Sequence, residues 1–229
     1  MVDLAGHSTG SGLPVFALHP APVQISGLGW METTGFPATD YLLTDKYLDG
    51  KLHKITDEMA AVWSRILQRV PESRLLLKCQ VFLDESMRHK VAERFAKHGI
   101  ESWRLLLEPT SSDYMQRYLA VDIALDTYPY TGGGTTLDAL YMGVPVVSRY
   151  GNRRSSRFGL SILANAGLPW LAAADVQAYI ELAVALAEDR SLLNDFHLGF
   201  RYLLGRSNVM NGRMYMRELE KQYVYLAEQ

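Results

Sequence analysis

The stretch DTYPYTGGGTTLD, residues 126–138, holds the strongest structural signal in the sequence. The apolar run VDIAL before it, residues 121–125, predicts a buried β-strand. The three glycines indicate a tight turn, and Thr135 or Thr136 can cap a helix expected over residues 136–142. A glycine-rich turn that leads from a strand into a helix leaves backbone N–H groups free to bind an anion. The stretch therefore predicts a phosphate site, although a tight turn without a ligand would have the same residues.

Asp138 ends this stretch and falls in the first turn of the expected helix. A carboxylate there can simply be favoured by the positive end of the helix. It can also accept hydrogen bonds from the ribose hydroxyls of a nucleotide whose phosphates lie at the glycines. The loop lacks the Gly-Lys-Ser/Thr ending of a Walker A motif and does not match GxGxxG, so the residues alone leave both interpretations open.

Strand and helix patterns alternate on both sides of the loop. Apolar runs predict buried strands, and apolar residues that recur at helical spacing predict helices between them. The expected strands are residues 74–78, 103–107, 121–125 and 144–148, and the expected helices begin at Thr56, Asp84, Ser111 or Ser112, and Thr136. Because parallel neighbours need helical crossovers, this order predicts an α/β fold with a parallel, Rossmann-like sheet.

The two ends of the chain differ from this central part. Residues 155–228 have an almost entirely helical pattern, which predicts a C-terminal helical tail. The last helix carries an apolar stripe that we expect to pack against the body of the domain, made of Met216, Leu219, Tyr223 and Leu226. Residues 1–50 are rich in Gly, Pro and Thr, with short strand-like runs at 23–26 and 41–44. We expect a domain boundary near residue 50.

The composition argues against several classes of protein. The 229-residue chain has 48% apolar and 21% charged residues, which is typical of a globular protein. Its 23 Lys and Arg against 25 Asp and Glu give a net charge of −2, which does not favour nucleic-acid binding. Cys79 is the only cysteine and the six histidines show no ligand spacing, so we expect neither a disulfide nor a metal site. Without an apolar run of about 18 residues or a secretory signal, we expect a cytoplasmic protein that does not bind membranes.

Two groups of basic residues are further candidates for contacts with an anion. Lys54 lies just before an expected helix, where a lone lysine is most often a solvated surface charge. Arg153, Arg154 and Arg157 cluster at the start of another expected helix, and exposed arginines commonly only solvate a surface. Either group gains a role only if the fold brings it to the glycine-rich loop.

Four motifs, in order, resemble the SPINDLY-type family of O-linked N-acetylglucosamine transferases. The first family motif is similar to HPAPVQISGLG at residues 19–29 followed by TDYLLTD at 39–45. LHKIT at 52–56 resembles the family's lysine segment, LDTYPYTGGGTTLDALYMGVPVV at 125–147 resembles its nucleotide loop, and SSRFG at 155–159 also matches. The similarity extends in pieces along almost the whole chain, and the order of the four motifs is more specific than any one of them.

The resemblance implies a fold and an activity. The fold is of the GT-B type, in which two Rossmann-like halves hold a nucleotide-sugar between them. Residues 1–50 would be a remnant of the N-terminal, acceptor-side half, and residues 51–229 would be the C-terminal, nucleotide-sugar-binding half. The implied reaction transfers a sugar, typically N-acetylglucosamine from UDP-N-acetylglucosamine, to protein Ser or Thr hydroxyls, with inversion and without a metal or other cofactor. Implied partners are the nucleotide-sugar, an acceptor protein, and a tetratricopeptide-repeat region or the rest of the N-terminal half.

The resemblance also implies roles for individual residues. The diphosphate would be bound by Lys54, Gly133, Gly134, Thr135 and Thr136. Asp138 would hold the ribose, and the sugar pocket would be lined by Leu28, Gly29 and His53. The physical chemistry agrees, because a departing diphosphate needs a helix N-terminus and a cation when no metal neutralises it. The general base would come from outside this chain.

The chain departs from the family pattern at three places. Gly133, Gly134 and Thr135 stand where the family usually has His-Thr-Thr, and Tyr114 stands where it often has another histidine. Only residues 46–50 separate the first motif from the lysine segment, where the family carries a long stretch that includes the first strand of the nucleotide half.

These departures keep two alternatives open. One is a non-catalytic fragment that binds a nucleotide-sugar, or a regulatory module. The other is another GT-B enzyme, such as a nucleotide-sugar epimerase. That enzyme would need a convincing pair of acid and base carboxylates facing the sugar, which the sequence does not offer.

Overall fold

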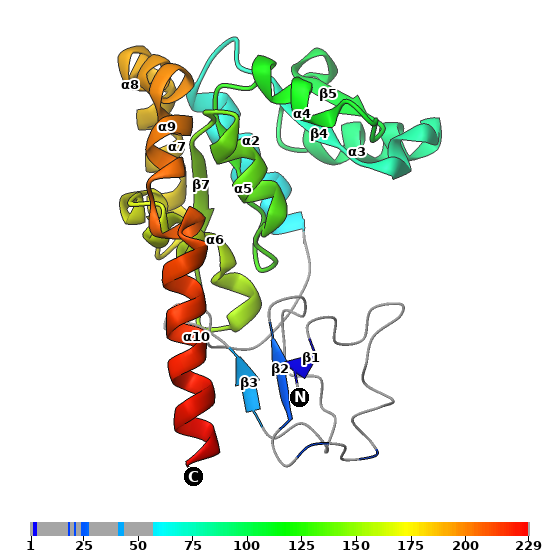
Figure 1. The fold of residues 1–229 in the computed structure, drawn as a ribbon. Coiled ribbons are helices and arrows are strands. Elements are labelled where there is room, and N and C mark those ends of the chain that lie inside the picture. The colour runs from blue at the N-terminus through cyan, green and yellow to red at the C-terminus, as the bar shows by residue number, and fades with distance from the viewer. Residues whose placement is uncertain are drawn as a thin grey trace.

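The structure, a computed structural model, describes residues 2–3, 18, 21, 24–27, 41–43 and 57–228. Within these ranges the chain forms a main body of parallel strands and helices, a small three-stranded sheet near the N-terminus, and a long C-terminal helix (Figure 1). The buried core lies in the main body, where it extends from Met59 to Leu204.

All pairings between the described strands of the main body are parallel, which confirms the expected α/β fold. One sheet pairs β4 (Leu75–Lys78) with β5 (Leu105–Glu108), and the other has the order β6-β7-β8, with β6 (Ala124–Leu125), β7 (Val146–Arg149) and β8 (Ala172–Ala173). The strand expected over residues 121–125 keeps only its last two residues, and β8 was not expected.

The strands of the main body are divided between two sheets. Within the described residues, no backbone ladder joins β4 to β6. In a doubly wound sheet with the order 3-2-1-4-5-6, strand 1 lies between strands 2 and 4. If β4 and β5 correspond to strands 2 and 3, and β6, β7 and β8 to strands 4, 5 and 6, the division falls at the place of strand 1. The sequence comparison with the SPINDLY-type family predicts the loss of this same strand.

The helices surround these strands. They are α2 (Asp57–Arg69), α3 (Glu85–Ala96), α4 (Tyr114–Arg117), α5 (Gly134–Tyr141), α6 (Phe158–Asn165), α7 (Val176–Glu188), α8 (Arg190–Asp195), α9 (Arg201–Gly205) and α10 (Gly212–Ala227). Short 3-10 turns lie at Gln80–Leu83, Ser102–Arg104, Tyr118–Ala120, Arg154–Ser156, Pro169–Leu171 and Asn208–Met210, and a π-helical segment spans Phe196–Phe200. The first four expected helices are all present, although α4 begins after Asp113 rather than after Ser111 or Ser112.

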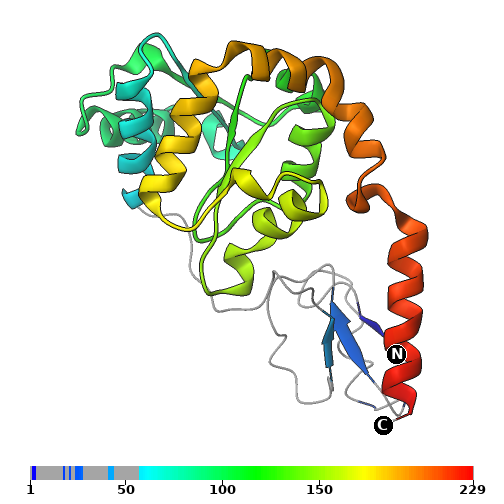
Figure 2. The same ribbon diagram turned by 90° about the vertical axis from the view of Figure 1, so that its left-hand side faces the viewer.

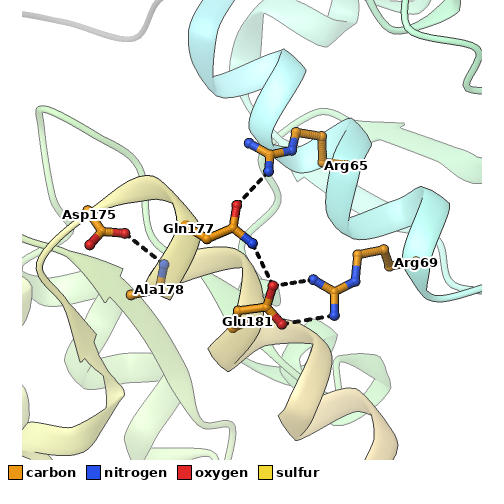
Figure 3. Close-up of polar contacts among 6 residues, drawn as sticks. All are labelled: Arg65, Arg69, Asp175, Gln177, Ala178 and Glu181. Atoms are coloured by element: carbon orange, nitrogen blue, oxygen red, sulfur yellow. Dashed lines mark hydrogen bonds and ion pairs between the residues drawn. The ribbon is translucent and has the colours of Figure 1, made fainter.

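Helices α2 and α7 pack side by side and connect the first part of the main body to its C-terminal part. Inside this contact, Trp63 Nε1 donates a hydrogen bond of 3.2 Å to the hydroxyl of Tyr179. On the exposed side, Arg69 Nη2 donates to Glu181 Oε2 at 2.9 Å (Figure 3). Exposed ion pairs typically contribute less than about 1 kcal/mol, so the buried apolar side chains supply most of the stabilisation.

The small sheet consists of β1 (Val2–Asp3), β2 (Ile25–Gly27) and β3 (Tyr41–Leu43). Its order is β1-β2-β3 and both pairings are parallel. The strand-like runs expected at 23–26 and 41–44 therefore form strands, each with slightly different ends. Figure 1 shows this sheet apart from the main body, at the level of α10.

The helical tail packs on the main body only as far as α9. Leu193, Phe196, Phe200 and Leu204 are buried, but α10 has no buried residue. Met216 and Tyr223 of the apolar stripe are exposed, so the expectation that this stripe packs against the domain is wrong. Figures 1 and 2 show α10 projecting away from the main body. Helical periodicity identifies an apolar face, but it does not identify the surface that covers that face.

Gly143 connects α5 to the chain segment that enters β7, and we expect its replacement by alanine to destabilise the protein. Its φ is +78°, and an added Cβ would lie 2.9 Å from the carbonyl oxygen of Phe196. Gly167 also has a positive φ, +83°, but a Cβ there meets no described atom within 4 Å. In urea unfolding, Gly143→Ala should lower the free energy of unfolding by about 2 kcal/mol or more, and Gly167→Ala by about 1 kcal/mol. Equal losses would contradict the role of the Phe196 contact.

Candidate functional site

The glycine-rich loop lies beyond the carboxyl end of β6, where parallel α/β sheets bind their ligands. The loop leads into α5, which begins at Gly134, two residues before the expected start. Gly133 is the N-cap residue and offers no side-chain cap, so the expectation that Thr135 or Thr136 caps the helix is wrong. The first N–H groups of an α-helix have no intrahelical acceptor, and here no cap side chain occupies them.

The start of α5 is open where an anion would approach it. A Cβ added at Gly133 or Gly134 would meet no described atom within 4 Å, and Gly134 and Thr135 are exposed. Thr136 differs, because its side chain is buried and its N–H donates to the carbonyl oxygen of Gly133 at 3.1 Å. The structure therefore places three of the four loop residues predicted to bind a diphosphate at an open surface and turns the fourth inward.

Asp138 lies in the second turn of α5, not in the first as expected, and is half-buried. The hydroxyl of Tyr114 donates to its Oδ2 at 3.3 Å. The hydroxyl of Tyr118 donates to the carbonyl oxygen of Thr135 at 3.3 Å, and burial raises the pKa of Tyr118 above its ordinary value. These two tyrosines place α4 and the turn that follows it beside the start of α5.

Sequence reasoning did not connect Tyr118 with the site and identified Tyr114 only as a departure from the family. The one available signal was their spacing of four residues, which lies on one face of a helix. That spacing alone does not reveal that the face meets α5.

Asp126 is the buried ionisable group of the site. Its Oδ1 accepts hydrogen bonds from the backbone N–H groups of Gly132 at 2.6 Å and Thr127 at 2.9 Å. Its Oδ2 accepts one of 2.7 Å from the hydroxyl of Ser148 in β7. Burial raises the pKa of Asp126 to about 7, and the three hydrogen bonds oppose this rise. Sequence reasoning used Asp126 only as the end of a strand.

A second loop, residues 150–157, lies beside the glycine-rich loop. The N–H of Thr131 donates to the carbonyl oxygen of Ser155 at 3.2 Å. Of the arginine cluster in this loop, Arg154 is buried and Arg157 donates to the carbonyl oxygen of Gly151 at 2.9 Å. The interpretation that these arginines only solvate a surface is therefore wrong for both. Arg149, which sequence reasoning missed, ends β7 and forms an ion pair of 3.1 Å with Glu58 of α2.

The remaining predicted site residues, Lys54, Leu28, Gly29 and His53, lie outside the described residues, so their roles stay predictions. Among the residues that are described, no group of three or more His, Cys, Asp and Glu side chains is arranged to hold a metal ion. In the same part of the chain, no helix combines the length and hydropathy needed to cross a membrane.

A parallel α/β body with an open helix N-terminus at the strand ends fits the GT-B glycosyltransferase fold, and the comparisons with known proteins agree on that fold. Residues 48–219 match glycosyl transferase family 41, and the chain belongs to this family. A mutant O-GlcNAc transferase from Thermobaculum terrenum has a similar structure, with a TM-score of 0.86 and 28% identity, over 97% of this chain and 51% of that one.

Two plant proteins illustrate the sequence similarity. The chain is 34% identical to a barley (Hordeum vulgare) protein and 33% identical to an Arabidopsis thaliana protein, each named probable UDP-N-acetylglucosamine–peptide N-acetylglucosaminyltransferase SPINDLY. Both alignments cover 97% of this chain but only 29% and 30% of those proteins. The barley alignment runs over 273 residues, whereas 97% of 229 is about 222, so about 50 aligned positions have no counterpart in this chain.

The buried carboxyl of Asp126 should make stability depend on pH. The unfolded chain releases this proton near pH 3.8, whereas the folded protein holds it up to about pH 7. Protonated Asp126 therefore adds to the free energy of unfolding fully below about pH 4, and this contribution is lost as the pH rises through 7. The total loss is up to roughly 4 kcal/mol. Hydrogen-bonding groups that face the carboxyl come from Thr127, Gly132 and Ser148, and Tyr179 lies against it from α7.

The measurement is urea unfolding between pH 4 and pH 8 for the wild type and Asp126→Asn. Subtracting the two profiles cancels the contributions of carboxylates with lowered pKa values, such as Glu108 beside Arg117. Those carboxylates make stability rise with pH, which is opposite to the effect of Asp126. The difference in the free energy of unfolding between the wild type and Asp126→Asn should change between pH 4 and pH 8. A difference that stays constant with pH would show that Asp126 titrates as an ordinary exposed carboxyl.

Proposed function

We propose that this chain is the donor-binding part of a transferase that moves N-acetylglucosamine from UDP-N-acetylglucosamine to Ser or Thr hydroxyls of proteins. The observation that carries the proposal is the uncapped start of α5 beyond the end of β6, with Asp138 one turn along the same helix. Membership of glycosyl transferase family 41 and the printed names of the relatives support the choice of donor and acceptor. Because the chain spans less than a third of these relatives, their activity enters only as part of the proposal.

The proposed chemistry needs positive potential where the sugar–phosphate bond breaks. The departing UDP carries the negative charge of its diphosphate, and helix N–H groups stabilise such a charge. In the proposal, the N–H groups at Gly134 and Thr135 and the ammonium of Lys54 supply this stabilisation without a metal. The acceptor hydroxyl attacks from the side opposite to the diphosphate, so the configuration at the sugar carbon is inverted.

Asp138 is proposed to bind the ribose. An ionised carboxylate offers about four acceptor sites on its two oxygens, so the hydrogen bond from Tyr114 to Oδ2 leaves capacity for ribose hydroxyls. Asp126 is not the general base of this proposal, because its side chain is buried beneath the loop. We propose that the base and most of the acceptor site belong to the N-terminal half, of which the small parallel sheet within residues 1–50 is a remnant.

The second candidate function is a non-catalytic module that binds a nucleotide-sugar. The division of the sheet between β4 and β6 within the described residues favours it, since a divided sheet supports the site less firmly but leaves the start of α5 intact. Both candidates expect UDP binding in a cytoplasmic protein. They differ in whether sugar is transferred.

Transfer assays separate these two candidates. We expect purified residues 1–229 to bind UDP but to transfer little N-acetylglucosamine from UDP-N-acetylglucosamine to a Ser/Thr peptide. General-base help is typically worth about 10²–10⁴-fold, and in this proposal the base is absent from the chain. Because little transfer by the chain alone fits both candidates, a parallel assay with an added full-length relative reports whether the chain changes the rate of transfer. Robust transfer by the chain alone would exclude the non-catalytic module and would also show that the general base lies within the chain.

Lys54 and Asp138 should each contribute to UDP affinity. Hydrogen bonds to charged groups are worth about 1.5–3 kcal/mol, so Lys54→Met and Asp138→Ala should weaken binding by roughly ten- to a hundred-fold. Isothermal titration calorimetry with UDP measures this, and Lys97→Met, at an exposed position after α3, is the control for loss of a positive charge. Wild-type affinity in both variants would exclude the proposed site.

Gly134→Val should abolish UDP binding without unfolding the protein. The valine side chain would occupy the open space at the start of α5, and Gly134 is not among the described glycines with a positive φ. Gly212→Val is a matched control, because Gly212 is also the first residue of a helix and a Cβ there also meets no described atom within 4 Å. UDP affinity should be lost only in the first variant, and an unchanged affinity in folded Gly134→Val would place the phosphates elsewhere.

A further inference from the structure

The carboxyl group of Asp126 lies where β6 turns into the glycine-rich loop, and it is hydrogen-bonded to two backbone N–H groups of that loop. Oδ1 accepts the N–H groups of Thr127, at the start of the loop, and of Gly132, at its far end. The six-residue segment from Thr127 to Gly132 therefore begins and ends with a hydrogen bond to this carboxyl. Only 8% of Asp126 is exposed, so its side chain acts on the loop from the protein side rather than on a ligand.

Gly132 passes this constraint on to α5. A Cβ at Gly132 would lie 2.6 Å from Thr136 Oγ1 and 2.7 Å from Thr135 Oγ1, so the loop backbone is in tight contact with the first turn of the helix. The Thr136 side chain is itself buried. The residue that donates to Asp126 therefore lies directly against the first turn of α5.

Asp126 also contacts the strand and helices that pack beneath the loop. Oδ2 accepts from Ser148 in β7, and the backbone carbonyl of Asp126 accepts 2.8 Å from the hydroxyl of Tyr179 in α7. A Cβ at Gly159 would collide with both Ser148 Oγ and Asp126 Oδ2, so the start of α6 also lies directly against this group. The glycine-rich loop is thus attached to β7 through the side chain of Asp126, and to α7 through the backbone carbonyl of the same residue.

We infer that Asp126 is a positioning residue of the donor site, which holds the N–H groups at the start of α5 in the arrangement that binds a diphosphate. The inference rests on the proposed function. A loop with three successive glycines has high conformational entropy, and ordering it during binding would lower affinity. Donors that are already in place bind charge without that cost.

Charge and geometry make opposite predictions for Asp126, which gives the test its power. An ionised Asp126 repels a diphosphate, so removal of the charge alone should strengthen UDP binding. Loss of the anchor should weaken it. Asp126→Asn removes the charge and keeps an acceptor oxygen for Gly132 and Thr127, whereas Asp126→Ala removes both.

The experiment is calorimetric titration of the whole chain with UDP at pH 7.5, with circular dichroism and thermal unfolding as checks of folding. We expect Asp126→Ala to bind UDP about ten-fold more weakly and Asp126→Asn to bind at least as tightly as the wild type. Rescue by asparagine is the result that general loss of stability would not produce. If folded Asp126→Ala binds as tightly as the wild type or more tightly, the inference is overturned.

A milder pair of variants covers the case in which Asp126→Ala does not fold. Ser148→Ala removes one hydrogen bond to the carboxyl of Asp126. Ser64→Ala is the matched control, because both serines are only 1% exposed but the hydroxyl of Ser64 donates to the carbonyl oxygen of Ala60 within α2. We expect about three-fold weaker UDP binding in the first and no change in the second. Equal affinities in the two variants would overturn the inference.

The outcomes also separate this inference from the proposed function. A folded wild-type chain that does not bind UDP would overturn both. UDP binding that is lost in Gly134→Val but kept in Asp126→Ala would leave the proposed site standing and remove only the positioning role.

Discussion

A carboxyl group buried at the junction of a parallel strand and a glycine-rich loop is the constraint on which the rest of this site depends. Asp126 connects β6, the loop, β7 through Ser148 and α7 through Tyr179. Burial of a carboxyl is unfavourable unless its oxygens are hydrogen-bonded, and three donors meet that need here. The arrangement stabilises a loop whose own sequence, with three glycines, favours no single conformation.

The fold could be predicted in outline because it is encoded in local patterns. Apolar runs such as residues 75–77 and 105–107 identify parallel strands, and the spacing of Met59, Val62 and Ile66 identifies α2. The glycine-rich loop likewise predicts an anion site, because it leads from an apolar run into a helical pattern. The partners of Asp126 were not visible, because Ser148 lies 22 residues away along the chain and Tyr179 lies 53 residues away.

Details of helix ends and surfaces were also beyond local reasoning. Thr135 and Thr136 are good capping residues, yet α5 starts before them, with Gly133 as its N-cap and Gly134 as its first residue. The periodic stripe of α10 predicts a face that packs against the domain, but α10 has no buried residue, because periodicity does not identify a partner surface. The roles proposed for Lys54, Leu28, Gly29 and His53 rest on family resemblance alone.

The divided sheet gives the main body an uneven resistance to local opening. In a parallel strand, alternate N–H groups point to opposite neighbours, and β7 is paired on both sides while β4 and β6 are paired on one side within the described residues. Amide hydrogens of β7 should therefore exchange with solvent only in rare, large openings, whereas half of those in β4 and β6 lack a ladder partner. The glycine-rich loop begins at the end of β6, so the proposed donor site borders a strand that has a ladder partner on one side only within the described residues.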